Sequence, residues 1–279
     1  MGADASEIQQ VVRCEVADGV ATITLDSPGN RNALSRAVLS GLHAALDRAE
    51  QSDVRAIVLT HTAPAFCAGA DLKERSSAPA DSTPMVRAMQ RLIEAKQPTI
   101  AAVQGPVRAG GIGLMASCDL VVVLDDVTFA FTEVRIGVAP AIISVPILQR
   151  CPWSKLAAPF LTGEVFDAHT ARDMGLVTHV TSDVAQVVSG VVEGVLLGAP
   201  NAVAATKQLL RGGRTWAEMQ ALSEALFSSD EAQEGMSAFA DRRAPRWTDP
   251  PQTDPPQTDP PQTDPPQSNQ QQSNQQQSK

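Results

Sequence analysis

Residues 98–122, PTIAAVQGPVRAGGIGLMASCDLVV, carry two short apolar runs on either side of a turn rich in glycine and alanine. The runs at 99–103 and 120–124 are too short for amphipathic helices and predict buried strands. Residues 112–117, which follow the glycine-rich turn, predict a short buried helix. A strand, a helix and a second strand in this order indicate an α/β layer architecture.

The sequence on both sides of this stretch continues the alternation of strands and helices. Residues 11–16 and 20–25 alternate apolar and polar side chains around Asp18-Gly19, which is typical of a β-hairpin. Three more segments follow: a helix at 35–49, a buried strand at 56–59 and an amphipathic helix at 84–95. From residue 154 to about 243 helical patterns dominate, as at 202–210 and 215–227, and predict a helical portion packed on the α/β core.

The end of the chain differs in composition from everything before it. From Thr248 the sequence repeats TDPPQ four times and then SNQQQ twice, with no apolar residue other than proline. Such a segment buries too little surface to offset the entropy lost on ordering, so it predicts a disordered tail. We therefore expect an α/β core at 1–190, a helical region at 191–247 and the tail at 248–279.

Charge and cysteine usage exclude several classes of function. The net charge of −9 argues against a basic face, and we expect no nucleic-acid partner. The cysteines, Cys14, Cys67, Cys118 and Cys151, are scattered without a C-x-x-C pair, which favours free thiols over a metal site or a disulfide framework. No apolar run reaches the length of about 18 residues typical of a membrane span, and the first ten residues lack an apolar signal core. We expect a cytoplasmic protein without membrane association.

Two loops of small residues follow predicted strands, at 64–73 and 104–113. Small side chains let a ligand approach main-chain N–H groups, and the second loop opens a helix whose N-terminus carries free donors. Two such loops side by side would supply the converging donors of an oxyanion hole. A rival interpretation is a dinucleotide site, because residues 111–116 match G-x-G-x-x-[GA], but Asp125 and Asp126 come too early for its acidic partner. A structural tight turn is the remaining alternative.

Five ordered segments give the sequence a family resemblance. They are PAFCAGADLKE at 64–74, the stretch at 98–122, TFAFTEVRIGVAP at 128–140, LTGEVFDAHTARDMGLVTHV at 161–180 and SSDEAQEGMSAFADRRAPRW at 228–247. Together they resemble the enoyl-CoA hydratase/isomerase (crotonase) family over nearly the whole chain outside the tail. The resemblance implies a crotonase-like spiral of ββα units, with a C-terminal helical region that assembles subunits into a trimer or hexamer.

The resemblance also implies a set of site residues. By position in the motifs, the backbone N–H groups of Ala70 and Gly110 would form an oxyanion hole for the thioester carbonyl of an acyl-CoA. Coenzyme A contacts are implied for Ala68, Asp71, Leu72 and Lys73, and, often from a neighbouring subunit, for Phe239 and Arg242. We expect no metal, and no cofactor other than the coenzyme A of the substrate.

Glu133 stands where the family carries its second catalytic glutamate. A carboxylate beside a polarised thioester moves protons to and from the acyl chain. The other glutamate of two-carboxylate hydratases is replaced here by Gly113, and the residues that follow it, Leu114, Met115 and Ala116, cannot transfer protons. This departure places hydration between two carboxylates in doubt.

Three functions therefore remain open. The first is an enoyl-CoA hydratase of lipid metabolism, a hydro-lyase that uses one glutamate. Its motifs are closest to the methylglutaconyl-CoA hydratase-like branch, whose branched substrates carry a second carboxylate. Arg108 or Arg135 would face this carboxylate; a surface role for each arginine is the alternative. The second is a Δ3,Δ2-enoyl-CoA isomerase with Glu133 as the sole base. The third is a non-catalytic acyl-CoA binder.

Overall fold

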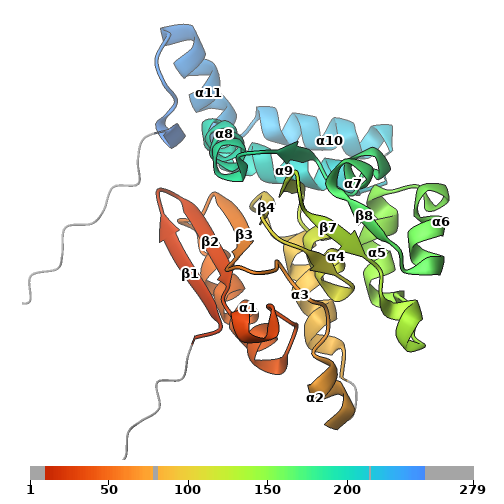
Figure 1. Ribbon diagram of the computed structural model, residues 1–279. Coiled ribbons are helices and arrows are strands. Elements are labelled where there is room, and N and C mark those ends of the chain that lie inside the picture. Colours follow the sequence, from red (N-terminus) through yellow and green to blue (C-terminus); the bar gives the residue numbers. More distant parts are fainter. Residues whose placement is uncertain (1–9, 78–80, 214, 249–279) are drawn as a thin grey trace, which may run out of the picture.

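The computed structural model describes residues 10–77, 81–213 and 215–248, so the predicted tail beyond Thr248 lies outside the described residues. The described chain forms a six-stranded sheet in the order β1-β2-β3-β4-β6-β9 and a three-stranded sheet in the order β5-β7-β8 (Figure 1). The strands are β1 (Val12–Ala17), β2 (Val20–Leu25), β3 (Ala56–His61), β4 (Thr99–Val103), β5 (Val107–Arg108), β6 (Leu120–Leu124), β7 (Thr128–Ala130), β8 (Val165–Asp167) and β9 (His179–Thr181).

The large sheet begins with the predicted hairpin. β1 and β2 pair antiparallel, and the turn between them holds Asp18 and Gly19 at φ of 50° and 76°. From β2 to β9 every neighbouring pair is parallel. Parallel strands are covered on both faces, which explains why β3, β4 and β6 read as continuous apolar runs instead of alternating ones.

Helices cover both faces of this sheet. Successive strand residues point to opposite faces: Ile57 and Val121 belong to the main core with α1 (Arg36–Ala49) and α3 (Thr83–Glu94). Val58 and Val122 belong to a second cluster with Val184 of α8 (Val184–Leu197). The predicted helices at 35–49 and 84–95 are confirmed as α1 and α3.

The small sheet and four helices follow β4 along the chain. The predicted helix at 112–117 is confirmed as α4 (Gly110–Ala116), which begins earlier than predicted and is buried along its whole length. It packs on α5 (Ala141–Arg150), which is followed by α6 (Trp153–Thr162) and α7 (Ala168–Met174). Stacked rings of Phe129 and Phe166, 5.5 Å between centroids, join β7 to β8. These strands escaped prediction because three residues are too few to show a period of two.

The C-terminal part of the chain is helical, as predicted, and α8 packs on the large sheet. Its helices are α8, α9 (Pro200–Arg211), α10 (Trp216–Phe227) and α11 (Asp230–Asp241), and α11 projects from the body (Figure 1). The predicted boundary at residue 190 falls within α8. Among the described residues no single helix has the length and apolar composition to span a membrane; the pair α8 and α9, bent by 114°, reaches both only when taken together.

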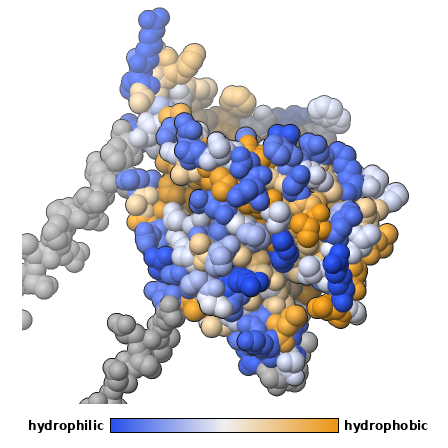
Figure 2. All heavy atoms as spheres, viewed as in Figure 1, coloured by the Kyte–Doolittle hydropathy of each residue, from blue (hydrophilic) through white to orange (hydrophobic). Residues whose placement is uncertain are grey.

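Large apolar side chains also remain at the surface. Trp153, Trp216 and Phe239 are 75%, 94% and 88% exposed. Figure 2 shows apolar groups interspersed with hydrophilic ones over the face turned to the viewer.

Candidate active site

Two loops leave the same edge of the large sheet and run side by side. They follow β3 and β4, which are parallel neighbours, so both loops emerge from the carboxyl ends of their strands. Phe66 N donates to Pro106 O at 3.1 Å and Arg108 N donates to Cys67 O at 2.9 Å. These backbone bonds hold the loops in parallel register and confirm that the two small-residue loops meet.

Buried polar side chains fix the first loop to its surroundings. Asn32 is fully buried and donates from Nδ2 to Thr62 O at 3.0 Å and Ala65 O at 2.8 Å. Nε2 of His61 accepts from Gln104 N at 2.9 Å while Nδ1 lies 3.0 Å from Thr62 O. Because Nε2 must accept, the ring is neutral with its proton on Nδ1. Burial lowers the pKa of His61, which favours this form.

The close approach of the loops requires glycine at position 69. A Cβ on Gly69 would lie 2.9 Å from Cβ of Ala109 and 3.5 Å from Gly110 N, and Gly69 has φ of +93°. A Cβ on Gly110 would lie 3.8 Å from Ala70 N. Ala109, the N-cap of α4, has φ of +47°, a region that alanine rarely adopts. The backbone nitrogens of Ala70 and Gly110 therefore lie next to each other at the start of α4.

A cavity of about 510 Å³ opens at this point, and its walls are mostly apolar. It is bounded by the two loops, by α2 (Leu72–Ser77), by the start of α3 and by the segment that leads into α5. Its lining residues are Ala68, Ala70, Leu72, Arg75, Ser82, Met85, Ala109, Gly110, Thr132, Glu133, Ile136, Val138, Ala139, Pro140, Ala141, Ile142 and Ile143. The structure thus brings Ala68, Ala70, Leu72, Gly110 and Glu133 to one cavity.

Glu133 is the carboxylate of this cavity. It begins a short 3-10 helix at Glu133–Ile136, after β7. Its Oε2 is buried and has no hydrogen-bond partner among the described residues. Burial raises the pKa of the Glu133 carboxyl, and its own backbone N–H opposes the shift. A buried carboxylate with an unused oxygen is costly unless a ligand or a proton satisfies it, which is the condition of a group that exchanges protons with a substrate.

Apolar groups fill the space around Gly113, the position at which two-carboxylate hydratases carry their other glutamate. A Cβ on Gly113 would lie 2.5 Å from Cγ2 of Ile143 and 2.8 Å from Cε of Met89. Glycine at 113 therefore allows α4 and α5 to pack closely, and no larger side chain fits without movement of α5. Within the described residues that line the cavity, Glu133 is the only carboxylate.

Comparison with known proteins gives the family of this chain. Residues 15–251 match the family model described as enoyl-CoA hydratase/isomerase. The chain belongs to this family. A Thermus thermophilus protein, named provisionally as an enoyl-CoA hydratase, is 36% identical over 246 residues, which cover 82% of this chain and 97% of that protein.

Solved structures of family members share the fold. The structure of an enoyl-CoA hydratase from Mycobacterium smegmatis matches with a TM-score of 0.79 at 30% identity, over 85% of this chain and 98% of that one. One from Mycobacterium avium matches with a TM-score of 0.68 at 40% identity, over 86% of this chain and 100% of that one. These matches confirm the predicted crotonase-like α/β fold with its helical C-terminal region.

The residues predicted to contact coenzyme A are not all brought together. Ala68 and Leu72 line the cavity, whereas the Asp71 carboxylate accepts hydrogen bonds from Lys73 N and Glu74 N at the start of α2. Lys73 is exposed. Phe239 and Arg242 lie on and just after α11, far from α2 in Figure 1, and neither lines the cavity. Within one chain they do not complete the site.

Arg108 and Arg135, for which a substrate carboxylate and a surface role were both open, contact other parts of the protein. The Arg108 guanidinium donates to Thr128 O at 2.6 Å, to Thr128 Oγ1 at 3.0 Å and to Val107 O at 2.9 Å. Arg135 Nε donates to Thr162 O at 3.2 Å. Neither lines the cavity. The cation that does so is Arg75, which follows the motif at 64–74 by one residue and carries no signal in the sequence that distinguishes it from a surface arginine.

Proposed function

We propose that this chain is a 2-enoyl-CoA hydratase that uses Glu133 as its single acid–base carboxylate. One observation carries the proposal: the unpartnered, buried oxygen of Glu133 shares a mostly apolar cavity with the adjacent backbone nitrogens of Ala70 and Gly110. Family membership supports an acyl-CoA as the ligand of this cavity.

The proposed reaction begins with polarisation of the thioester. The carbonyl oxygen accepts hydrogen bonds from the N–H groups of Ala70 and Gly110, and the second of these is at the first turn of α4, where N–H groups have no partner within the helix. The bonds strengthen as negative charge develops on the oxygen. C3 of the enoyl group becomes electrophilic, and an enolate becomes accessible.

Glu133 then transfers one proton in two steps. The ionised carboxylate removes a proton from water as the water oxygen bonds to C3, and the π electrons of the C2–C3 bond move through C2 onto the thioester oxygen. The protonated Glu133 delivers that proton to C2 as the carbonyl re-forms. The apolar surroundings that raise the pKa of Glu133 bring its proton affinity closer to the neutral range, where a general acid–base is most effective.

An isomerase is the second candidate, because Ile143 and Met89 occupy the space beside Gly113. Isomerisation of a 3-enoyl-CoA needs one base only. Glu133 would remove a proton from C2, the thioester would hold the dienolate, and the same proton would return to C4. No second carboxylate and no bound water are required.

Coenzyme A would extend from the cavity past Leu72 and Lys73, and Phe239 and Arg242 would reach it from a neighbouring copy of this chain. A cytoplasmic trimer or hexamer with no further cofactor is part of the proposal. Phe239 is 88% exposed in the single chain, as expected for a side chain that contacts another subunit.

The test mixes the purified chain with crotonyl-CoA and, separately, with 3-hexenoyl-CoA, and follows products by mass spectrometry. The gain of one water by crotonyl-CoA supports the hydratase. Conversion of 3-hexenoyl-CoA to its 2-enoyl isomer without hydration of crotonyl-CoA would replace it with the isomerase. Binding of both thioesters without turnover would contradict both activities and leave the non-catalytic binder.

A further inference from the structure

Arg75 is the one cationic side chain among the described residues that line the cavity. It lies on α2, half-buried, one helical turn after Leu72. Both terminal nitrogens of its guanidinium donate to Oγ of Ser82, each at 3.2 Å. No ion pair joins Arg75 to a carboxylate among the described residues, and the neutral hydroxyl of Ser82 accepts both of these hydrogen bonds.

The Ser82 side chain accepts from Arg75 and does not cap α3. It occupies the N-cap position of α3, where a serine side chain ordinarily accepts from the backbone of the first turn, yet it makes no such bond. The nearby Asp81 is engaged differently, since its carboxylate accepts from Thr83 N at 2.9 Å. Arg75 makes a smaller contribution to the lowered pKa of Asp81 than that backbone contact does. The Arg75–Ser82 pair therefore remains available to a ligand.

Landmarks on α3 relate Arg75 to the reacting centre. Met85 of α3 lies beside the predicted oxyanion hole, because its Sδ would lie 3.4 Å from a Cβ on Gly110. Ser82 lies three residues before Met85, about 4.5 Å along the helix axis, and its hydroxyl accepts from Arg75. Arg75 does not contribute to the pKa of Glu133. Arg75 and Glu133 thus line the same cavity without Arg75 changing the pKa of the Glu133 carboxyl.

We infer that the cavity accepts an acyl-CoA whose acyl chain ends in a second carboxylate, and that Arg75 with Ser82 binds this carboxylate. This inference rests on the proposed function. A guanidinium binds a carboxylate through two parallel hydrogen bonds, and this interaction is stronger in apolar surroundings such as these. The phosphates of coenzyme A are the other anion in such a ligand, but the exposed Lys73 is better placed for groups that stay in solvent.

The inference is tested by calorimetric binding of three probes: coenzyme A, valeryl-CoA and glutaryl-CoA. The two thioesters have five acyl carbons each and differ in a terminal methyl or carboxylate. The wild-type protein should bind glutaryl-CoA about 10- to 100-fold more tightly than valeryl-CoA, the range for hydrogen bonds to charged groups. R75Q should reduce this preference to about twofold, and R75K should keep part of it because lysine retains charge without the fork.

Arg87 supplies the matched control. It is exposed on α3 and does not line the cavity, so R87Q removes the same charge and should keep the wild-type preference. Equal affinity of the wild type for glutaryl-CoA and valeryl-CoA would overturn this inference alone. A loss of coenzyme A affinity in R75Q as large as the loss for glutaryl-CoA would also overturn it and assign Arg75 to a phosphate. Failure of all three probes to bind the wild type would overturn the proposed function and this inference together.

Discussion

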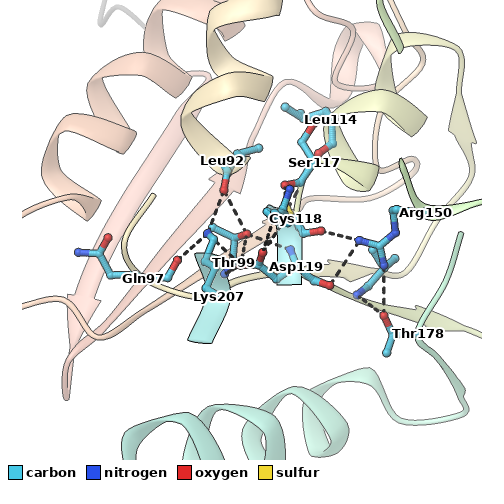
Figure 3. Close-up of polar contacts among 12 residues, drawn as sticks. Leu92, Gln97, Thr99, Leu114, Ser117, Cys118, Asp119, Arg150, Thr178 and Lys207 are labelled. Atoms are coloured by element: carbon cyan, nitrogen blue, oxygen red, sulfur yellow. Dashed lines mark hydrogen bonds and ion pairs between the residues drawn. The ribbon is translucent and has the colours of Figure 1, made fainter. Parts of the chain in front are cut away.

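Asp119 and Glu133 are two partly buried carboxylates with opposite surroundings. Asp119, between α4 and β6, accepts from Thr99 N at 2.8 Å and pairs with Lys207 at 2.9 Å and Arg211 at 2.6 Å (Figure 3). Glu133 leaves Oε2 without a partner in an open cavity. The first carboxylate is satisfied by hydrogen bonds and ion pairs within the protein. In the proposed function the second exchanges protons with a substrate. Burial alone does not distinguish the two roles, whereas hydrogen-bond satisfaction does.

Breaking the satisfied cluster should have the largest effect. Lys207 is 4% exposed and also donates to Leu92 O and Gln97 O, so it ties α9 to the core. Lys207→Ala leaves Asp119 short of a buried partner and should lower the free energy of unfolding by about 3–5 kcal/mol. Urea denaturation measures the loss. An unfolding free energy within about 0.5 kcal/mol of wild type would show that the pair does not stabilise the chain.

Removing the unsatisfied carboxylate of Glu133 should lower activity and leave the free energy of unfolding undiminished. Glu133→Gln should lower kcat at least about 100-fold, or about 2.7 kcal/mol, by loss of the acid–base group. Stability should not fall. Because the folded pKa of Glu133 is raised, the ionised carboxylate opposes folding above its ordinary pKa, and glutamine removes that cost. Glu164→Gln, at an exposed position, is the control for activity and denaturation. A mutant that turns over normally would refute the assignment.

The packing that excludes a second carboxylate is tested at Gly113. Gly113→Ala places a Cβ 2.5 Å from Ile143 and should lower the free energy of unfolding by about 1–3 kcal/mol through overpacking. Gly190→Ala, in α8 with nothing within 4 Å of its Cβ, should instead stabilise by about 0.5–1 kcal/mol. Thermal denaturation of both variants gives the comparison. Equal stabilisation of both would mean that α4 and α5 are not closely packed.

The smallest expected effect is a change of stability with pH that comes from His61. The folded pKa of His61 is lowered, so unfolded chains bind the proton more readily, and stability present above about pH 6.5 should fall as pH is lowered toward the folded pKa. His61→Gln should flatten this dependence between pH 7 and 5, and the exposed His169→Gln should not. Denaturant midpoints across this range provide the measurement. A wild-type stability that rises on acidification would contradict the neutral ring.

The sequence predicts those parts of the fold that short-range residue patterns encode. The hairpin at Asp18-Gly19, the buried strands and the two loops follow from periodicity and small residues. Glu133 did not: its role came from a family resemblance, and the structure adds that its oxygen is unsatisfied. Arg75 and Ile143 became visible only in three dimensions, because their importance depends on which wall of the cavity they form.

The central claim is that Glu133 moves a proton at C2 of a thioester held by Ala70 and Gly110. The most direct measurement is deuterium incorporation at C2 of butyryl-CoA in D₂O, which requires neither hydration nor isomerisation. The wild type and Glu164→Gln should catalyse this exchange, and Glu133→Gln should not, although it still binds the thioester. Exchange at the wild-type rate in Glu133→Gln would contradict the claim.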